Sequence, residues 1–170
     1  IENKALQYLI SYDLMAFNLK FKSSYSLQVH TIGFYGTTYF RNLENIKSQK
    51  ALRNREKAYK GSRPELIRAL YAEALEPNKF QIYYKRFKVN PWDYFKIESI
   101  KDSDLKKVSL DNKVDILYDN TEQSTIEFLT PFIFIDLYGN YTDVEKVIFS
   151  GVMGEHRIGE LLPFDYGLQN

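Results

Sequence analysis

A capped amphipathic helix in the middle of the chain is the feature that most restricts its fold. Ser62-Arg63-Pro64-Glu65 has the form of a capping box, in which a serine hydroxyl and a glutamate three residues later satisfy free backbone N–H groups. Proline is favourable in this first turn because its missing N–H would have no partner there. Apolar residues then recur at helical spacing, at Leu66, Ile67, Leu70 and Ala74. We predict a helix that is capped by Ser62 and Glu65, buries Leu70 and is ended by Glu76-Pro77.

A second, weaker helix is expected just before this one. Between Asn42 and Lys60 the apolar residues are sparse and unevenly spaced, so a helix there would bury only a narrow stripe. Gly61 is well placed to end it, because glycine readily takes the left-handed conformation that follows many helices. The sequence therefore predicts two helices around residues 42–76.

The rest of the chain has the alternation that is typical of β-strands. Tyr8, Ile10 and Tyr12 share one parity within residues 6–21, which Leu14 and Ala16 continue, with a bend expected near Asp13. Residues 25–36 read as the neighbouring strand. The 14 Tyr and 12 Phe also favour sheet, because aromatic side chains fit a pleated, half-buried surface.

Five further segments carry strand patterns after the helices. Residues 79–87 alternate, and residues 91–100 are expected to continue the same path. A hairpin is predicted within residues 111–130, with its turn at Asn120-Thr121-Glu122. Residues 131–136 suggest a strand covered on both faces, and residues 144–151 suggest a last strand. We predict a single α+β domain over residues 1–170, with mostly antiparallel sheet.

Composition excludes several classes of protein. A net charge of +1 gives no global field that would attract nucleic acid, and the absence of cysteine excludes disulfides and Cys-type zinc sites. No apolar run reaches the length of a membrane span, so no transmembrane segment is predicted. Since the chain begins at Ile1 without Met, we expect that a signal peptide was removed.

One local charge asymmetry stands out. Between Arg41 and Arg68 there are nine Lys or Arg and three Glu. Helices that contact phosphate look like this, but so does a solvated helix with a narrow apolar stripe. Residues such as Lys47, Arg53 and Lys57 are too irregularly spaced for one contact line, so we interpret the segment as a solvated face and predict no nucleic-acid partner.

No catalytic motif accompanies the two histidines, His30 and His156. The chain has no G-x-S-x-G, H-E-x-x-H, P-loop or G-x-G-x-x-G pattern, so we predict no catalytic residues, no cofactor and no metal. Asp136 with Gly139-Asn140 could suggest calcium, but these residue types also suit a tight turn, which is our interpretation. Binding candidates are Trp92, Tyr94 and His156.

The apolar tail is expected to lie against the body of the protein. Pro163 and Tyr166 flank Asp165 among further apolar residues. We predict that the Asp165 carboxylate forms a buried ion pair with an arginine of the helical segment, with Arg68 as first choice and Arg55 as second.

Several segments together resemble one known family. The residues that carry the resemblance are IENKALQYLISYDL, FYGTTYF, RNREKAYKGSRPELIRALYAEAL and GELLPFDY. They are similar to the segment that follows the carboxypeptidase regulatory-like domain in secreted and envelope proteins of Bacteroidota. The chain departs from that pattern at Pro64-Glu65 and at GVMGEH, so no site near Glu155 is carried over.

The resemblance implies a place in the cell envelope or outside the cell, and no peptidase chemistry. It also implies a missing N-terminal β-sandwich as a partner, for which we expect exposed backbone or apolar surface near Leu6 to Tyr12. The leading hypothesis is a non-enzymatic envelope module that serves binding or assembly, with an envelope protein or a glycan as possible partner. A small-ligand or glycan-binding domain is the alternative, and a degenerate hydrolase around His156 is the third.

Overall fold

The computed structural model describes residues 1–43 and 48–168, without the side chains of residues 30 and 31. The chain divides into two compact units, residues 1–52 and residues 53–170. The sequence analysis expected a single domain, whereas contacts divide the chain into two units. The two long strands of the first unit pair with each other over nearly their whole length, so most contacts of these strands lie within that unit. The side chain of His30, and Lys47 of the basic segment, lie outside the described part of the chain.

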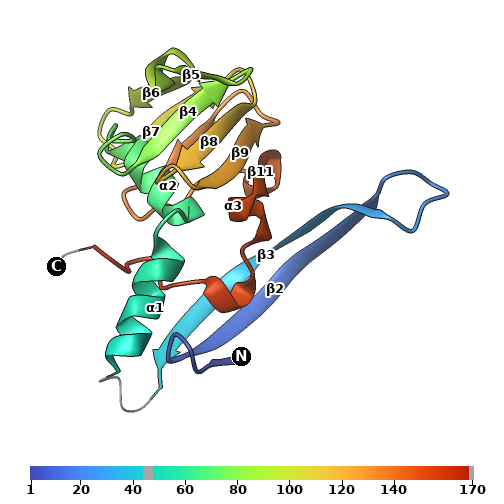
Figure 1. Cartoon of the computed structure of the whole chain (residues 1–170), viewed down its shortest axis with the longest axis vertical. Helices are drawn as coiled ribbons and strands as arrows, with labels where there is room; N and C mark the ends of the chain where they lie inside the picture. Colours follow the sequence, from blue (N-terminus) through green and yellow to red (C-terminus); the bar gives the residue numbers. More distant parts are fainter. Residues whose placement is uncertain (44–47, 169–170) are drawn as a thin grey trace. The chain divides into compact units, whose positions relative to one another are not determined.

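The first unit is built on a long β-hairpin, drawn in blue in Figure 1. Its strands are β1 (Glu2–Asn3), β2 (Tyr8–Phe21) and β3 (Val29–Asn42), in the order β1-β2-β3. The antiparallel β2–β3 pairing confirms the predicted neighbours, and the bend expected near Asp13 corresponds to a break in register between Leu14 and Ala16.

Apolar side chains at the base of this hairpin are buried, contrary to expectation. Leu6, Tyr8 and Ile10 are buried, with Ile10 only 1% exposed. The prediction that apolar surface is exposed near Leu6 to Tyr12 is therefore wrong for these three residues, and the exposed apolar residues lie farther along the hairpin.

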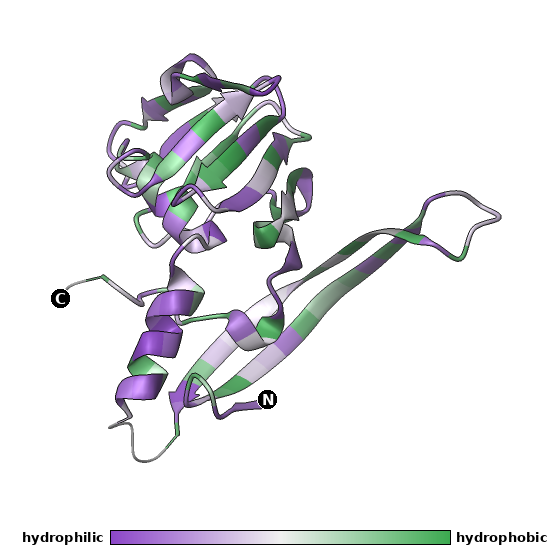
Figure 2. Ribbon diagram, in the orientation of Figure 1, coloured by the Kyte–Doolittle hydropathy of each residue, from purple (hydrophilic) through white to green (hydrophobic). Residues whose placement is uncertain are grey.

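Two helices follow β3. They are α1 (Gln49–Tyr59), whose surface is mostly hydrophilic in Figure 2, and α2 (Arg63–Tyr71). The predicted start of α2 is confirmed, because the Ser62 hydroxyl accepts a hydrogen bond from the Glu65 N–H. The helix ends at Tyr71, earlier than Glu76-Pro77, and the chain then turns through Glu73 at a φ of 52°.

The second unit contains two antiparallel sheets. The five-stranded sheet has the order β11-β9-β8-β4-β5 and the three-stranded sheet has the order β10-β7-β6. The bounds are β4 (Phe80–Tyr84), β5 (Phe87–Val89), β6 (Phe95–Ser99), β7 (Lys106–Leu110), β8 (Val114–Tyr118), β9 (Glu122–Phe128), β10 (Ile133–Ile135) and β11 (Val147–Gly151). The chain is thus α+β with mostly antiparallel strands.

One hydrophobic core joins α2 to both sheets. Leu66, Ile67 and Leu70 of α2 are 0% exposed, as predicted for the apolar face of the helix. They belong to the same buried cluster as Phe80 of the five-stranded sheet and Phe95 of the three-stranded sheet. Complete burial of these side chains makes α2 a central part of the second unit.

Two strand predictions in this unit require correction. The segment 79–87 is not one strand, because Lys85 and Arg86 both have positive φ and turn β4 back into β5. Two successive positive φ values are typical of the tight hairpin turns whose twist matches that of the strands. Of residues 91–100, only Phe95–Ser99 form a strand, β6, and this strand belongs to the other sheet.

The second correction concerns residues 131–136. Their strand, β10, has three residues and lies at the edge of its sheet, with Ile133 and Ile135 buried and Phe134 only partly buried. It is therefore covered fully on one face. The predicted hairpin within 111–130 and the last strand are confirmed as β8–β9 and β11.

Candidate functional site

The start of α2 is fixed by a small polar cluster. The Glu65 carboxylate accepts a 2.6 Å hydrogen bond from the Gly61 N–H, one residue before the cap. Burial raises the pKa of Glu65, while the Gly61 hydrogen bond and Lys60 act in the opposite direction. Burial, followed by the charge of Glu65, raises the pKa of Tyr118 to about 12. Glu65 therefore connects the start of α2 to strand β8.

Arg68 fastens the C-terminal tail to α2 through backbone carbonyl groups. Its guanidinium donates hydrogen bonds to the carbonyl oxygens of Tyr166 and Phe164. It also donates to the Tyr138 carbonyl oxygen at 3.0 Å and to the Tyr59 hydroxyl at 3.1 Å. These four acceptors belong to three separate segments, so the planar, five-donor group of Arg68 holds the tail, the end of α1 and the Tyr138 turn together.

The partner predicted for Arg68 is wrong. Asp165 is exposed, and among the described residues its carboxylate forms no ion pair with Arg68. Arg55, the second choice, is buried at 7% exposure. The carbonyl groups on either side of Asp165 take the guanidinium donors, so its side chain stays in solvent. Pro163 accepts a hydrogen bond from the Tyr166 N–H and thereby helps to shape the turn.

The basic segment is partly directed at the protein itself. Besides Arg68, the Arg63 guanidinium lies 5.8 Å from the centre of the Phe149 ring. Lys60 forms an ion pair with Glu56 one turn earlier on α1, and both side chains are more than half exposed. The cations thus have two roles here: some pack inward, and others are solvated.

Trp92 lies in a short turn whose shape follows from its sequence. Asn90 precedes the 3-10 turn η1 (Pro91–Asp93), and its side chain accepts a hydrogen bond from the Trp92 N–H at 3.4 Å. Pro91 fixes the backbone at the first position of the turn. The Trp92 side chain is half-buried and packs against the core.

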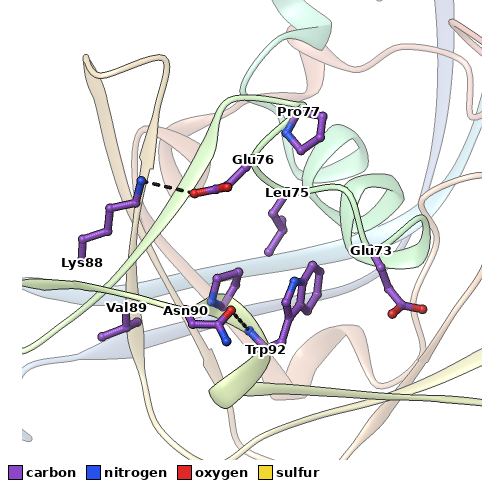
Figure 3. A pocket seen from close by; sticks show the side chains of 9 residues that line it. Glu73, Leu75, Glu76, Pro77, Lys88, Val89, Asn90 and Trp92 are labelled. Carbon is purple, nitrogen blue, oxygen red and sulfur yellow. Dashed lines mark hydrogen bonds and ion pairs between the residues drawn. The ribbon is translucent and has the colours of Figure 1, made fainter.

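The Trp92 turn borders a groove with a volume of about 440 Å³. In Figure 3 the Trp92 ring and Leu75 lie between Glu73 on one side and the Glu76–Lys88 ion pair, at 3.3 Å, on the other. The lining residues are Glu73, Leu75, Glu76, Pro77, Lys88, Val89, Asn90, Pro91 and Trp92. An aromatic ring flanked by carboxylates and an amide could bind a molecule that is partly apolar and rich in hydroxyl groups.

The structure does not bring the other two binding candidates to this groove. Tyr94 packs against Tyr84, with ring centres 5.0 Å apart, and it is not among the residues that line the groove. His156 follows the short helix α3 (Val152–Glu155) and is also absent from the lining. Burial lowers the pKa of His156, partly offset by Glu160, and thereby favours the neutral imidazole.

Asp136 closes a turn, as the sequence interpretation expected. Its carboxylate accepts hydrogen bonds from the N–H groups of Tyr138 and Asn140, both at 2.9 Å. Its second oxygen accepts from the Asn140 side-chain amide. Among the side chains that the structure describes, which do not include that of His30, no three His, Asp or Glu gather as a metal site would require. No helix in residues 1–43 and 48–168 is long and apolar enough to cross a membrane.

A surface that the sequence analysis missed lies on the outer part of the hairpin. We call it the hairpin face and define it by seven residues: Leu14, Phe17, Leu19, Phe21, Val29, Ile32 and Phe34. Phe17 pairs with Phe34, and Leu19 pairs with Ile32. The seven side chains are between 38% and 58% exposed. Figure 2 shows the apolar segments that recur along both strands.

Two breaks in register, between Leu14 and Ala16 and between Lys20 and Phe21, explain why these residues share one face. Leu14 pairs with Gly36 and Ala16 pairs with Tyr35, so Met15 is an extra residue on β2. A bulge of this kind shifts the alternation by one, which places Phe17 on the same face as Leu14. Gly36 is required opposite the bulge, because a Cβ there would overlap the Asp13 carbonyl oxygen.

The other face of the outer hairpin has a different character. Ala16, Asn18 and Lys20 lie there on β2, by the alternation that follows the bulge. Apolar and polar faces are thus separated along the outer part of β2, as in a sheet that is covered on one side.

Comparison of the chain with protein-family models, with curated proteins and with solved structures finds no match.

Proposed function

We propose that this chain is a non-enzymatic module of the cell envelope that serves binding or assembly. The observation that supports it best is the hairpin face, an exposed row of seven apolar side chains. Monomeric soluble proteins rarely expose apolar patches larger than a few hundred Å², and larger ones mark interaction sites. The face also needs a cover for its own stability, since a two-stranded ribbon is marginally stable in water.

The resemblance of the sequence supports the rest of this proposal. The similar family segments follow a β-sandwich in secreted and envelope proteins, so we place this module after such a domain and behind a removed signal peptide. In this scheme α1 and α2 form a two-helix insert between the hairpin strands and the sheets of the second unit. The upstream domain and an envelope protein are both candidate partners of the module.

Single-cysteine labelling tests whether the hairpin face is covered where the protein works. The chain contains no cysteine, so Ile32→Cys reports the hairpin face and Thr37→Cys reports the opposite face of the same strand. We expect both thiols to react with a membrane-permeant maleimide in the dilute purified chain. In intact source cells, Ile32→Cys should be protected at least tenfold relative to Thr37→Cys. Equal reaction rates in cells would contradict the proposal.

A second candidate function is binding of a small ligand or glycan in the groove beside Trp92. The groove offers an aromatic surface for the C–H face of a sugar ring, and Glu73, Glu76 and Asn90 can bond to hydroxyl groups. Because Trp92 is the only tryptophan, its fluorescence reports this groove directly.

Titration with defined oligosaccharides tests this second function. We expect a saturable shift of Trp92 emission, weakened about tenfold by Glu76→Gln. The control is Glu98→Gln, because Glu98 pairs with Lys107 and does not line the groove. Emission that stays constant up to millimolar sugar would contradict binding at this groove.

A further inference from the structure

We propose that the hairpin face docks a second copy of this chain, face to face, about a two-fold axis that crosses the strands at the Phe17–Phe34 pair. This inference rests on the proposed function, which makes the hairpin face an assembly surface. It adds the identity of the partner and the geometry of the contact.

The face is self-complementary about this axis. Its rows, from the base outward, are Leu14–Gly36, Phe17–Phe34, Leu19–Ile32 and Phe21–Val29. A two-fold axis through the second row sets the first row of one copy against the third row of the other. Ile32 of one copy then lies opposite Gly36 of the other. The first three rows thus meet only apolar side chains or glycine, as in sheets that pack face to face about 10 Å apart.

The chemistry of the face suits a copy of itself. None of its seven residues carries a charge, so two identical faces meet without repulsion between like charges. The nearest charged residues on β2, Asp13 and Lys20, alternate onto the opposite face. A charged partner would find no residue of opposite charge on this face.

The geometry favours face packing over addition of a strand at the edge. The extra residue Met15 interrupts β2 between Leu14 and Ala16, and bulges of this kind obstruct pairing with another strand. Insertion into lipid is also unfavourable, because the free edges of β2 and β3 in the outer hairpin would leave backbone groups without partners in hydrocarbon. The seven side chains, in contrast, lie on one face of the hairpin and are exposed.

The area is sufficient for a specific but modest dimer. A fully buried aromatic side chain covers about 150–250 Å², so seven half-exposed side chains remove on the order of 500 Å² per copy, or roughly 1,000 Å² for the pair. That total is close to the lower limit of about 1,000 Å² for a biological interface. We therefore expect a dimer that depends on protein concentration.

Sedimentation equilibrium of the purified chain across a concentration series tests the proposal. We expect a monomer–dimer equilibrium that Phe17→Ser and Ile32→Ser weaken by at least tenfold. Tyr39→Ser is the matched control: Tyr39 is 70% exposed but pairs with Ser11 on the opposite face, so its loss should leave the equilibrium unchanged. A dimer dissociation constant that stays unchanged in both Phe17→Ser and Ile32→Ser would overturn the proposal.

Disulfide trapping gives a second readout that does not depend on destabilising variants. The two-fold axis places residue 17 of one copy against residue 17 of the other. Phe17→Cys should therefore form a covalent dimer under mild oxidation, and Thr37→Cys should not. A chain that is monomeric at all concentrations and not trapped by Phe17→Cys would overturn the second copy as partner. Protection of Ile32→Cys in cells would then still support assembly with a different partner.

Discussion

The Arg68 guanidinium donates a hydrogen bond to the backbone carbonyl of Tyr166, 98 residues later in the chain. The same group binds the carbonyl of Phe164, so the two carbonyls on either side of Asp165 converge on one cation. Tyr59 packs beside the Tyr166 ring at 5.6 Å between centres and beneath the guanidinium at 5.3 Å. Tail, α1 and α2 are thus held at one point by an arginine that has no carboxylate partner among the residues described.

Removing this arginine should release the tail. Arg68→Ala is expected to lower the free energy of unfolding by about 2–4 kcal/mol, because hydrogen bonds to a charged group contribute about 1.5–3 kcal/mol each and do not add fully. Asp165→Asn should change it by less than about 0.5 kcal/mol, as for an exposed surface site. Urea denaturation of both variants and of the double variant gives the coupling energy. A coupling of several kcal/mol would mean that the Asp165 carboxylate matters after all.

The sequence was sufficient for the elements that depend on local chemistry. The start of α2 follows from the side chains of Ser62 and Glu65, and the burial of Leu70 follows from helical spacing. The hairpin of β8 and β9 likewise follows from alternation and turn residues, although its turn begins at Asp119-Asn120, both with positive φ. These features need no knowledge of distant segments.

The hairpin face was missed because one inserted residue reverses the alternation. Apolar residues occupy even positions up to Leu14 and odd positions from Phe17 onward, and the break at Met15 places both sets on one face. Grouping Ala16 with Leu14 therefore assigned it to the wrong face. The change of parity was visible in the sequence, and together with Gly36 opposite the bulge it could have indicated the shift.

The tail contact could not be predicted in detail for a different reason. An arginine and an aspartate suggest an ion pair. Every residue has a backbone carbonyl, so the sequence does not show which carbonyls an arginine will bind. Arg68 lies where the carbonyls of Phe164 and Tyr166 both point toward it. Long-range arrangement of the backbone, and not the identity of Asp165, decides which acceptor is used.

The cap and the core of α2 should differ in their contribution to stability. Ser62→Ala is expected to cost about 1 kcal/mol, since it removes the acceptor for the Glu65 N–H. Leu70→Ala is expected to cost about 2–5 kcal/mol, because Leu70 is fully buried. Leu129→Ala, at a residue that is 54% exposed, is the control and should change stability little. Denaturant midpoints that fail to follow this order would show that α2 is not packed as described.

Gly61 should not tolerate a side chain. Its φ is +71°, and a Cβ would lie 2.6 Å from Glu122 Oε2 and 2.9 Å from the Tyr118 ring. We expect Gly61→Ala to destabilise the protein by about 1–3 kcal/mol, the usual strain of a residue held in a disfavoured conformation. Gly33→Ala is the comparison, because the nearest atom would be 3.9 Å away. Thermal denaturation should separate the two variants clearly, and equal melting temperatures would contradict the close packing at Gly61.

The phenol of Tyr118 should make the protein less stable at high pH. Burial first, and then the charges of Glu65, Asp119 and Glu122, raise the pKa of Tyr118 to about 12 from an ordinary value of 10.0. Because the folded state holds the phenol proton more tightly than the unfolded state, the stability from this group is fully present below pH 10. It is lost as the pH rises from 10 to about 12, where the unfolded chain releases the proton first.

Two measurements check this pH dependence. Burial also raises the pKa of Tyr141 and of Tyr166, so the assignment needs a variant: absorbance of tyrosinate in the folded protein should include a phenol titrating near pH 12 that Tyr118→Phe removes. Urea denaturation between pH 9 and pH 11 should show a smaller loss of stability with pH for Tyr118→Phe than for the unmodified chain. Tyr25→Phe is the control, because Tyr25 is fully exposed and its loss should leave the slope unchanged. Identical slopes for Tyr118→Phe and the unmodified chain would show that the phenol is not held in its protonated form by the fold.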